Sequence, residues 1–401
     1  MTHFDALETR SSDQREEDQD KALAALIDHA ISYAPGMAKH LGQPGTVGSR
    51  EALAKLPVLR KSDMGAAQKA SPPFGGFSVG RSHHAFQSPG PIYEPGGTGD
   101  DWYRMGRFLH AAGISGADLV QNCFSYHFTP AGMMFESGAK AVGARVFPAG
   151  TGQTEQQVNA AAHLQTTAYA GTPDYLKLIL EKADEMGAKL NFTRAVVGGG
   201  ALFPSLRAEY ADRGIACLQC YATAELGNIA YESPAQEGMI VDEGVIVEIV
   251  RPGTGDPVAE GEVGEVVVTS FNRDYPLIRF ATGDLSAILT GVSPCGRTNT
   301  RIKGWMGRAD QTAKIKGMFV RPEQVAALVA RYAEINRARI TVTRENERDV
   351  MLVQVEGQGI DADAVSASVR DILKLGGTVE VVSQGSLPND GKVIDDQRTY
   401  G

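Results

Sequence analysis

The chain has 401 residues, which is too long for one ordinary hydrophobic core, so we expect two or more domains. Its content of 42% hydrophobic and 22% charged residues is typical of a globular protein. The formal net charge of −9 argues against nucleic acid as the main partner. No apolar run reaches the length of about 18 residues that a membrane span needs, and the charged N-terminus lacks a signal-peptide core. Four cysteines make no disulfide framework, which predicts a reducing cytoplasm.

Short strands and helices alternate through the first half of the chain. Residues 1–20 are charged, and we expect them to be frayed. Apolar residues recur at helical spacing from Lys21 to His40, and a further helix starts near Ser62 or Asp63. Helices then follow at 102–112, 131–141, 154–164 and 174–186, between strands at 117–122, 144–148, 167–170 and 194–200. This alternation predicts a largely parallel sheet with helices on both faces.

The character of the chain changes twice after this region. Between about residues 239 and 305, valine-rich strands with Gly, Pro and Asp turns predict a small antiparallel β subdomain. From about residue 311 the pattern is strand, helix 322–333, strands 338–344 and 350–356, helix 361–375 and strand 378–383. We therefore predict an α/β fold with a large N-terminal domain, 1–309, and a small mobile α+β C-terminal domain, 310–401.

Four short motifs carry the functional information. They are Tyr221-Ala222-Thr223-Ala224-Glu225, the segment 279–285, the segment 307–317 and Gly391-Lys392. Each alone could be an exposed turn or hairpin. Their order and spacing resemble the adenylate-forming enzymes, which activate a carboxylic acid with ATP, and the chain looks most like the phenylacetate–CoA ligase family. The resemblance extends from about Leu56 to Asp395. It implies that the large domain carries the acyl and ATP sites and that the small domain is a lid.

The segment 95–101 is rich in glycine, whose backbone N–H groups can face anionic oxygens. A segment of this composition, taken alone, is more often a flexible turn. The resemblance implies a phosphate-binding loop, matched at Gly96, Thr98 and Gly99. The family's expected threonine is Gly97 here, and its lysine and proline are the pair Asp100-Asp101. Because acids beside a triphosphate repel it, we expect weak ATP binding that Asp100→Lys or Asp101→Lys would tighten.

The resemblance also implies the contacts to the rest of the nucleotide. Gly199, Gly200 and Ala201 follow a strand and would contact adenine, which Tyr221 would flank. Thr223 lies one position before the family's threonine, which is Ala224 here. Asp284 would accept hydrogen bonds from both ribose hydroxyls, since a carboxylate suits a vicinal diol. The matching cation on the ribose or phosphate side would be Arg308.

Two residues are implied to be catalytic. The Glu225 carboxylate suits a Mg²⁺ ion that bridges ATP phosphates. Lys392, which follows Gly391 near the C-terminus, would stabilise the charge that develops as the adenylate forms. Asp310 would be the hinge of the small domain, and Lys316-Gly317 would approach the CoA channel. The implied cofactors are therefore ATP, Mg²⁺ and CoA.

The resemblance further implies an acyl pocket at Tyr126, His127, Phe128 and Thr172, and the aromatic residues favour an aryl acid. Aromatic residues at this density are also common in an ordinary core, and His127 fits either environment. Many relatives carry zinc ligands where this chain has Ser233, Met239 and Ser293 beside a single Cys295. The Cys217/Cys220 pair has no second pair to complete a zinc site, so we predict no zinc.

The predicted reaction is the activation of a small carboxylic acid, aryl or arylacetic, to an acyl-adenylate, followed by transfer to CoA. The partners are small molecules rather than nucleic acid or membrane, and a homodimer is possible. Two alternatives remain open. The chain could deliver the acyl group to an amine or to a carrier-protein thiol, or it could be a degenerate relative that binds a nucleotide or acyl ligand without turnover. Gly97, Asp100, Asp101 and Ala224 are the departures that keep the last alternative open.

Overall fold

The computed structural model describes residues 3–80, 82–88, 91–97, 99–251, 255–309, 311, 313–315, 318–320, 322–345, 348–388 and 392–398. Within these ranges the side chains of residues 62, 314, 319, 322, 323, 326 and 348 are outside the description. The chain splits into two compact units, Met1–Gly307 and Arg308–Gly401, which are described separately below.

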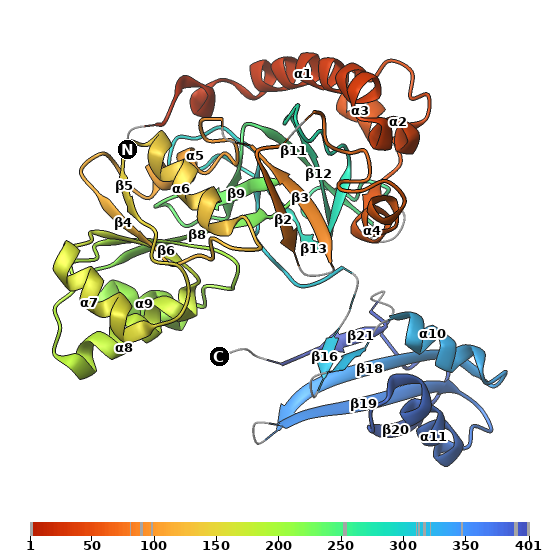
Figure 1. Ribbon diagram of the computed structural model, residues 1–401. Coiled ribbons are helices and arrows are strands. Elements are labelled where there is room, and N and C mark those ends of the chain that lie inside the picture. The colour runs from red at the N-terminus through yellow and green to blue at the C-terminus, as the bar shows by residue number, and fades with distance from the viewer. Residues whose placement is uncertain are drawn as a thin grey trace. The chain divides into compact units, whose positions relative to one another are not determined.

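The larger unit contains a nine-stranded mixed sheet (Figure 1). Its strands lie in the order β14 (Ile288–Leu289), β15 (Arg301–Ile302), β10 (Met239–Val241), β9 (Gly227–Glu232), β8 (Ala216–Thr223), β7 (Arg194–Val197), β6 (Ala168–Gly171), β4 (Leu119–Asn122) and β5 (Arg145–Phe147). The strands from β8 to β5 pair in parallel, and those from β8 to β14 pair antiparallel.

Helices cover both faces of the parallel half of this sheet (Figure 1). Helices α5 (Gly106–Ala111) and α6 (Ala131–Ala141) lie on one face, and α7 (Thr154–Leu164), α8 (Pro173–Met186) and α9 (Pro204–Asp212) lie on the other. Successive side chains of a strand point to opposite faces. Accordingly Ala168 and Ala170 of β6 pack with Phe135 of α6, whereas Tyr169 packs with the α7–α9 layer. The predicted α/β fold class is confirmed.

The larger unit also contains a four-stranded sheet. Its strands lie in the order β1 (Leu59–Arg60), β13 (Phe280–Ser286), β12 (Gly264–Ser270) and β11 (Val245–Val250), and they are antiparallel except for the β1–β13 pair. Strands β2 (His84–Ser88) and β3 (Ile92–Gly96) form a separate hairpin. The remaining helices of this unit are η1 (Ala6–Thr9), α1 (Ser12–Tyr33), α2 (Pro35–Leu41), α3 (Arg50–Leu53) and α4 (Lys61–Ala70).

The expectation of a frayed N-terminus is wrong for the described part of residues 1–20. Glu8 is fully buried, where its carboxylate accepts hydrogen bonds from Arg297 Nε at 2.7 Å and Tyr231 Oη at 2.7 Å. These partners stand more than 200 residues away in the sequence, so local composition gave no sign of them. The single helix expected from Lys21 to His40 is two helices, because Pro35 begins α2 and disfavours a helical conformation in Ala34.

The smaller unit is an α+β fold. Strands β20 (Thr378–Val382), β19 (Arg348–Gly357), β18 (Ile335–Glu345) and β21 (Ile394–Asp396) form a sheet in that order. Helices α10 (Pro322–Ala330) and α11 (Ala362–Leu373) contribute Leu328 and Val369 to its core, and β16 (Ala313–Ile315) pairs with β17 (Met318–Val320).

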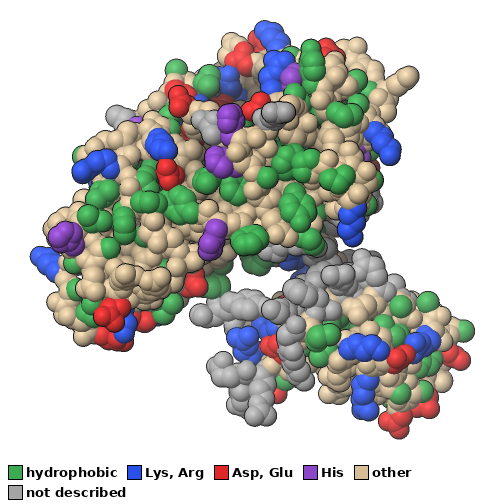
Figure 2. Space-filling view, in the orientation of Figure 1, with side chains coloured by type: hydrophobic (Ala, Val, Ile, Leu, Met, Phe, Trp, Pro, Cys, Tyr) green, Lys and Arg blue, Asp and Glu red, His purple; other side chains and the backbone are tan. Residues whose placement is uncertain are grey.

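None of the described helices has the length and apolar character that a membrane crossing requires. Figure 2 shows acidic and basic side chains interspersed on the face that it draws.

Candidate functional site

The predicted adenine-binding turn lies at the edge of the sheet where the parallel strands end. Ligands of open α/β sheets bind at this edge. Gly199 adopts a φ of +71°, which glycine accommodates without strain. A Cβ atom added to Gly199 would lie 3.9 Å from both Phe124 and Thr172, which follow β4 and β6. The structure therefore brings the turn at Gly199, Gly200 and Ala201 together with Thr172, one of the predicted acyl-pocket residues.

Asp284 lies on the neighbouring sheet with both carboxylate oxygens engaged. Tyr221 Oη donates to Oδ2 at 2.8 Å, and Trp305 Nε1 donates to Oδ1 at 3.1 Å. Asp284 is buried, and these donors fix the plane of its carboxylate. The structure thus places Tyr221, predicted beside the adenine, in hydrogen-bond contact with Asp284, predicted at the ribose. Trp305 was missed, because a tryptophan before a glycine turn has no distinctive pattern.

Glu225 follows β8 in the tight turn that leads into β9. Its side chain is 2% exposed, and its Oε1 lies 2.5 Å from Lys61 Nζ, the first residue of α4. Thr223 Oγ1 accepts a hydrogen bond from the backbone N–H of Leu226 at 3.2 Å and so closes the turn. The hydroxyl proton of Thr223 remains able to donate to a ligand.

A second buried carboxylate, Glu94, stands immediately before the predicted phosphate loop. Ser88 Oγ donates to its Oε1 at 2.5 Å, and its Oε2 has no hydrogen-bond partner among the described residues. Burial raises the pKa of Glu94 to about 7, and the charge of Glu225 adds to the rise, whereas the Ser88 hydroxyl and the Lys61 ammonium oppose it. Sequence reasoning missed Glu94 and Lys61, since neither belongs to a recognisable motif.

The loop itself is shaped by close packing. A Cβ atom at Gly96 would lie 2.5 Å from Phe86 and 2.8 Å from the hydroxyl of Tyr103, and one at Gly97 would lie 2.3 Å from the indole of Trp102. At position 97 the Trp102 ring occupies the space that a side chain would need. Gly99 has open space around it, and Thr98 lies outside the described residues.

The expected repulsion between Asp101 and a triphosphate has no support in the geometry. The two oxygens of this carboxylate accept hydrogen bonds from the backbone N–H groups of Met105 at 2.7 Å and Gly106 at 2.8 Å, at the start of α5. Burial raises the pKa of Asp101 to about 6, and the charge of Asp242 adds to the rise, whereas these two N–H groups and Arg104 oppose it. Asp101 therefore caps the first N–H groups of α5 from four residues before its N-cap, and the helix begins at Gly106 rather than at residue 102.

The predicted acyl-pocket residues after β4 lie in a turn with mixed exposure. Tyr126 is half-buried, and its hydroxyl accepts a hydrogen bond from Asn122 Nδ2 at 2.8 Å. The exposed His127 places Nδ1 2.6 Å from Ser125 Oγ. Phe128 is 72% exposed and adopts a φ of +61°, so no described side chain encloses its ring. The role of these three residues in acid binding stays a prediction.

Lys392 and Arg308 belong to the smaller unit. Lys392 Nζ lies 2.9 Å from Asp395 Oδ1, and Arg339 donates to the other oxygen of Asp395 at 2.9 Å. Burial raises the pKa of Asp395, but hydrogen bonds from Lys392, Gln397 and Arg339 outweigh it and hold the pKa at about 2. Arg308 is exposed. The predicted hinge Asp310 and the predicted CoA-channel residues Lys316 and Gly317 lie outside the described residues.

Ser233, Ser293 and Cys295, which the zinc prediction considered, form a hydroxyl–thiol cluster. Ser293 Oγ lies 3.0 Å from Cys295 Sγ. Burial raises the pKa of Cys295, but hydrogen bonds from Ser233, Ser293 and Arg297 outweigh it and lower the pKa to about 7. Met239 packs in a different part of the core.

Cys217 and Cys220 face opposite sides of β8, because they join different core clusters. Within the described part of the chain, no group of three or more His, Cys, Asp or Glu residues could hold a metal ion. The absence of zinc stays a prediction, which metal analysis of the purified protein would test.

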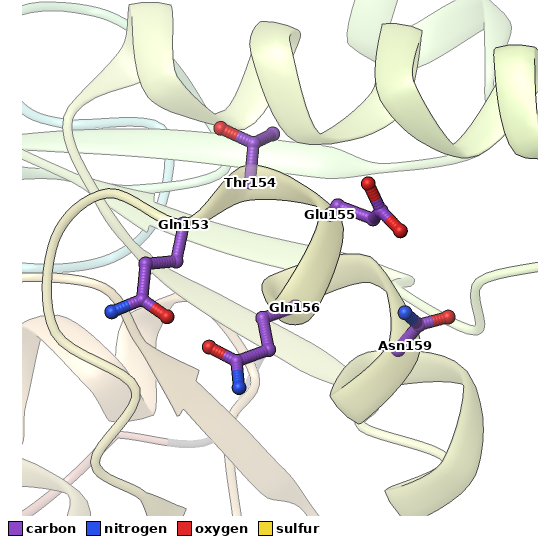
Figure 3. Close-up of a pocket in the computed structure, with 5 residues that line it drawn as sticks. All are labelled: Gln153, Thr154, Glu155, Gln156 and Asn159. Carbon is purple, nitrogen blue, oxygen red and sulfur yellow. The ribbon is translucent and has the colours of Figure 1, made fainter.

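A shallow polar pocket lies at the first turn of α7 (Figure 3). In this view the side chains of Gln153 and Gln156 extend to the same side of the turn, and Thr154 extends to the other. The five residues that line the pocket are Gln153, Thr154, Glu155, Gln156 and Asn159. None of the predicted site residues is among them, so the pocket is separate from the residues gathered around Asp284 and Glu225.

Part of the chain matches a known protein family. Residues 105–272 match the model of the AMP-binding enzymes. This segment contains the turn at Gly199, the Tyr221–Glu225 motif and the predicted acyl-pocket residues.

Two curated relatives carry the same name. The phenylacetate-coenzyme A ligase of Thermus thermophilus is 28% identical over 380 residues, which cover 89% of this chain and 84% of the relative. The phenylacetate-coenzyme A ligase of Escherichia coli is 29% identical over 381 residues, which cover 88% and 85% respectively. The similarity therefore extends over most of both chains.

Solved structures give the same fold. A 2-hydroxyisobutyryl-CoA ligase in complex with 2-HIB-AMP and CoA superposes with a TM-score of 0.73 at 23% sequence identity, over 98% of this chain and 91% of that chain. A second structure of that ligase, in the postadenylation state, superposes with a TM-score of 0.72.

Proposed function

We propose that this chain, a phenylacetate–CoA ligase-like member of the adenylate-forming enzymes, joins a carboxylic acid to CoA at the expense of ATP. In the first step a carboxylate oxygen attacks the α-phosphorus of ATP, which gives an acyl-adenylate and releases pyrophosphate. In the second step the CoA thiol attacks the acyl carbon, loses its proton and releases AMP. No side-chain nucleophile is required, because the nucleotide provides the leaving group and the protein provides position and charge.

One observation carries this proposal. Asp284, buried and oriented by Tyr221 and Trp305, presents a carboxylate of fixed plane in the same unit as the glycine turn at Gly199. A fixed carboxylate suits the two hydroxyls of a ribose, and an open glycine turn suits a flat base. The pair of features fits an adenosine, which both steps of the reaction require.

Magnesium is part of the proposal, and the chain's donors fit it. Glu225 provides a hard carboxylate oxygen, and Glu94 provides a second buried carboxylate with an unpartnered oxygen. Mg²⁺ is commonly bound by one or two carboxylates together with substrate phosphates. When bound, the ion would neutralise charge on the leaving pyrophosphate. Glu225 would hold it, and the Thr223 hydroxyl would donate to a phosphate oxygen.

The smaller unit would supply the remaining groups. Lys392 already takes part in a charged pair with Asp395, and its side chain is half exposed, so its ammonium can exchange this partner for an anionic substrate. We propose that it contacts the α-phosphate and the substrate carboxylate in the first step, and that Arg308 contacts the ribose or phosphate side. Rotation at Asp310 would then bring Lys316-Gly317 to the CoA channel for the second step.

Three further assignments complete the proposal. An aryl or arylacetic acid fits the names of the curated relatives and the aromatic residues after β4. A cytoplasmic location fits the four cysteines, which are free thiols in the structure. A homodimer belongs to the proposal too, and light scattering on the purified protein would test it.

The experiment that tests the function is pyrophosphate release with a panel of aryl acids, with and without CoA. A CoA ligase releases pyrophosphate only when an acid is present and forms a thioester only when CoA is added. Acid-dependent release without any thioester would favour an enzyme that delivers the acyl group to another acceptor. Nucleotide binding with no release for any acid would indicate a relative without turnover and would contradict the proposal.

A further inference from the structure

Lys61 is a cation beside the predicted phosphate loop that no motif of the sequence marks. Its ammonium lies 2.5 Å from the buried Glu225 carboxylate, while its own side chain is 40% exposed. It also lies close enough to the buried Glu94 for the two charges to interact. One partly exposed ammonium therefore lies near two buried carboxylates, at the point where the chain enters the loop 95–101.

The backbone around Lys61 holds the ammonium at this place. Lys61 follows β1 directly, and β1 pairs in parallel with β13, the strand that carries Asp284. Helix α4 is hydrogen-bonded to β3 through Gln68. The Gln68 side chain donates to the backbone carbonyl of Tyr93 at 2.7 Å and accepts from the backbone N–H of Tyr93 at 2.9 Å. Helix α4 is thus held at its start by the strand that pairs with the strand of Asp284, and near its end by the strand that ends in Gly96.

The family resemblance implies a lysine in the loop, and this chain has the pair Asp100-Asp101 there instead. The structure shows that Asp101 does not face a ligand in the loop. Asp101 stands at that part of the loop, and its carboxylate is occupied with the start of α5. The neighbouring Arg60 pairs with Glu265 at 3.1 Å on the other sheet strand, so it does not serve the loop either. Polyphosphate binding needs positive charge, and Lys61 is the described ammonium that faces this set of carboxylates.

We propose that Lys61 binds the β- and γ-phosphates of ATP and thereby replaces the lysine that the loop lacks. In the free protein its ammonium neutralises Glu225, and when ATP binds it turns to the phosphates on its flexible four-carbon stem. This inference rests on the proposed function, because it assumes that ATP is the nucleotide. It adds a cation to the phosphate-binding residues predicted in the loop, Gly96, Thr98 and Gly99.

Calorimetric titration with ATP and with AMP, in EDTA to remove metal ions, tests the proposal. Lys61→Met should weaken ATP binding about tenfold or more, since it removes a charge-assisted contact, and should leave AMP binding unchanged. Lys61→Arg should recover part of the loss. Glu225→Gln should bind metal-free ATP at least as tightly as wild type, because it releases the ammonium and removes a negative charge. Lys69→Met, an exposed lysine near the other end of α4, is the matched control and should behave as wild type.

Two outcomes would overturn the inference. Unchanged ATP binding in folded Lys61→Met would show that Lys61 serves only to neutralise Glu225. An equal loss for ATP and AMP would show that the substitution disturbs the adenosine site rather than a contact to the outer phosphates. Melting temperatures identify any variant that fails to fold, and Lys61→Gln then takes its place. Failure of wild-type protein to bind ATP at all would instead contradict the proposed function, so the two failures are distinguishable.

Discussion

Asp284→Asn tests the nucleotide site with the smallest possible change in shape. The amide oxygen of the substituted side chain can accept from Trp305 Nε1, which only donates, and its NH₂ can donate to Tyr221 Oη, which can also accept. The local fold should therefore persist. What changes is the charge of the group that the two ribose hydroxyls would meet, and one of its two acceptor oxygens becomes an NH₂ donor.

The size of the effect follows from the two hydrogen bonds. A hydrogen bond to a charged group contributes about 1.5–3 kcal/mol, and one between neutral groups contributes about 0.5–1.5 kcal/mol. The difference is about 1 kcal/mol for each ribose hydroxyl, and the sum of about 2 kcal/mol corresponds to a roughly 30-fold weaker Kd for ATP. Asp284→Ala, which removes the acceptor entirely, should weaken binding further.

Calorimetric titration with ATP and with 2′,3′-dideoxy-ATP isolates the ribose contact. Wild type and Asp284→Asn should differ for ATP and agree for the dideoxy nucleotide, as a double-mutant cycle requires. Asp118→Asn is the matched control, because Asp118 is also buried and accepts from Thr167 Oγ1 at 2.9 Å, but it precedes β4 at the opposite edge of the sheet. A Kd for ATP in folded Asp284→Asn within about threefold of wild type would refute the assignment of the ribose site.

Three further predictions concern other parts of the molecule. Lys392→Ala should slow adenylate formation about a hundredfold or more in a pyrophosphate assay while it leaves thioester formation from added acyl-adenylate intact, and a wild-type rate in the first step would contradict its catalytic role. Asp101→Lys should lower the free energy of unfolding by about 1–2 kcal/mol in urea titrations, because α5 loses its cap, and tighter ATP binding would restore the original expectation of repulsion. The smaller unit should lose about 2 kcal/mol as pH falls from about 4 to about 2, because the pKa of Asp395 is lowered in the fold and protonation removes its ion pairs; acid titrations should show this loss in wild type and not in Asp395→Asn.

Local pattern was enough to predict much of the larger unit. Helices α6 and α7 have the predicted bounds, since apolar periodicity between glycine and proline turns is a local property. Tyr221 and Asp284 were each predicted from a motif, but their hydrogen bond to one another was not. The second donor to Asp284, Trp305, could not be anticipated either, since hydrogen bonding between segments far apart in the sequence depends on how they pack.

The failures have the same physical origin. Glu8 is buried because Arg297 and Tyr231, far away in sequence, surround it, and a charged terminal segment reveals nothing of such partners. Asp101 stands in the glycine loop in sequence, yet its carboxylate turns back to cap α5. Whether a charge acts on a ligand depends on the direction of its side chain, and the spacing of residues in the sequence does not give that direction. Lys61 shows the converse, because it lacks a motif but lies against Glu225.

The central claim is that a carboxylate oxygen attacks the α-phosphate of ATP and that CoA then takes the acyl group. Turnover of the best acid of the panel, labelled with ¹⁸O at both carboxylate oxygens, measures this directly by mass spectrometry. The account predicts one ¹⁸O in the AMP released and one in the thioester carbonyl. Unlabelled AMP, or ADP as the nucleotide product, would contradict it.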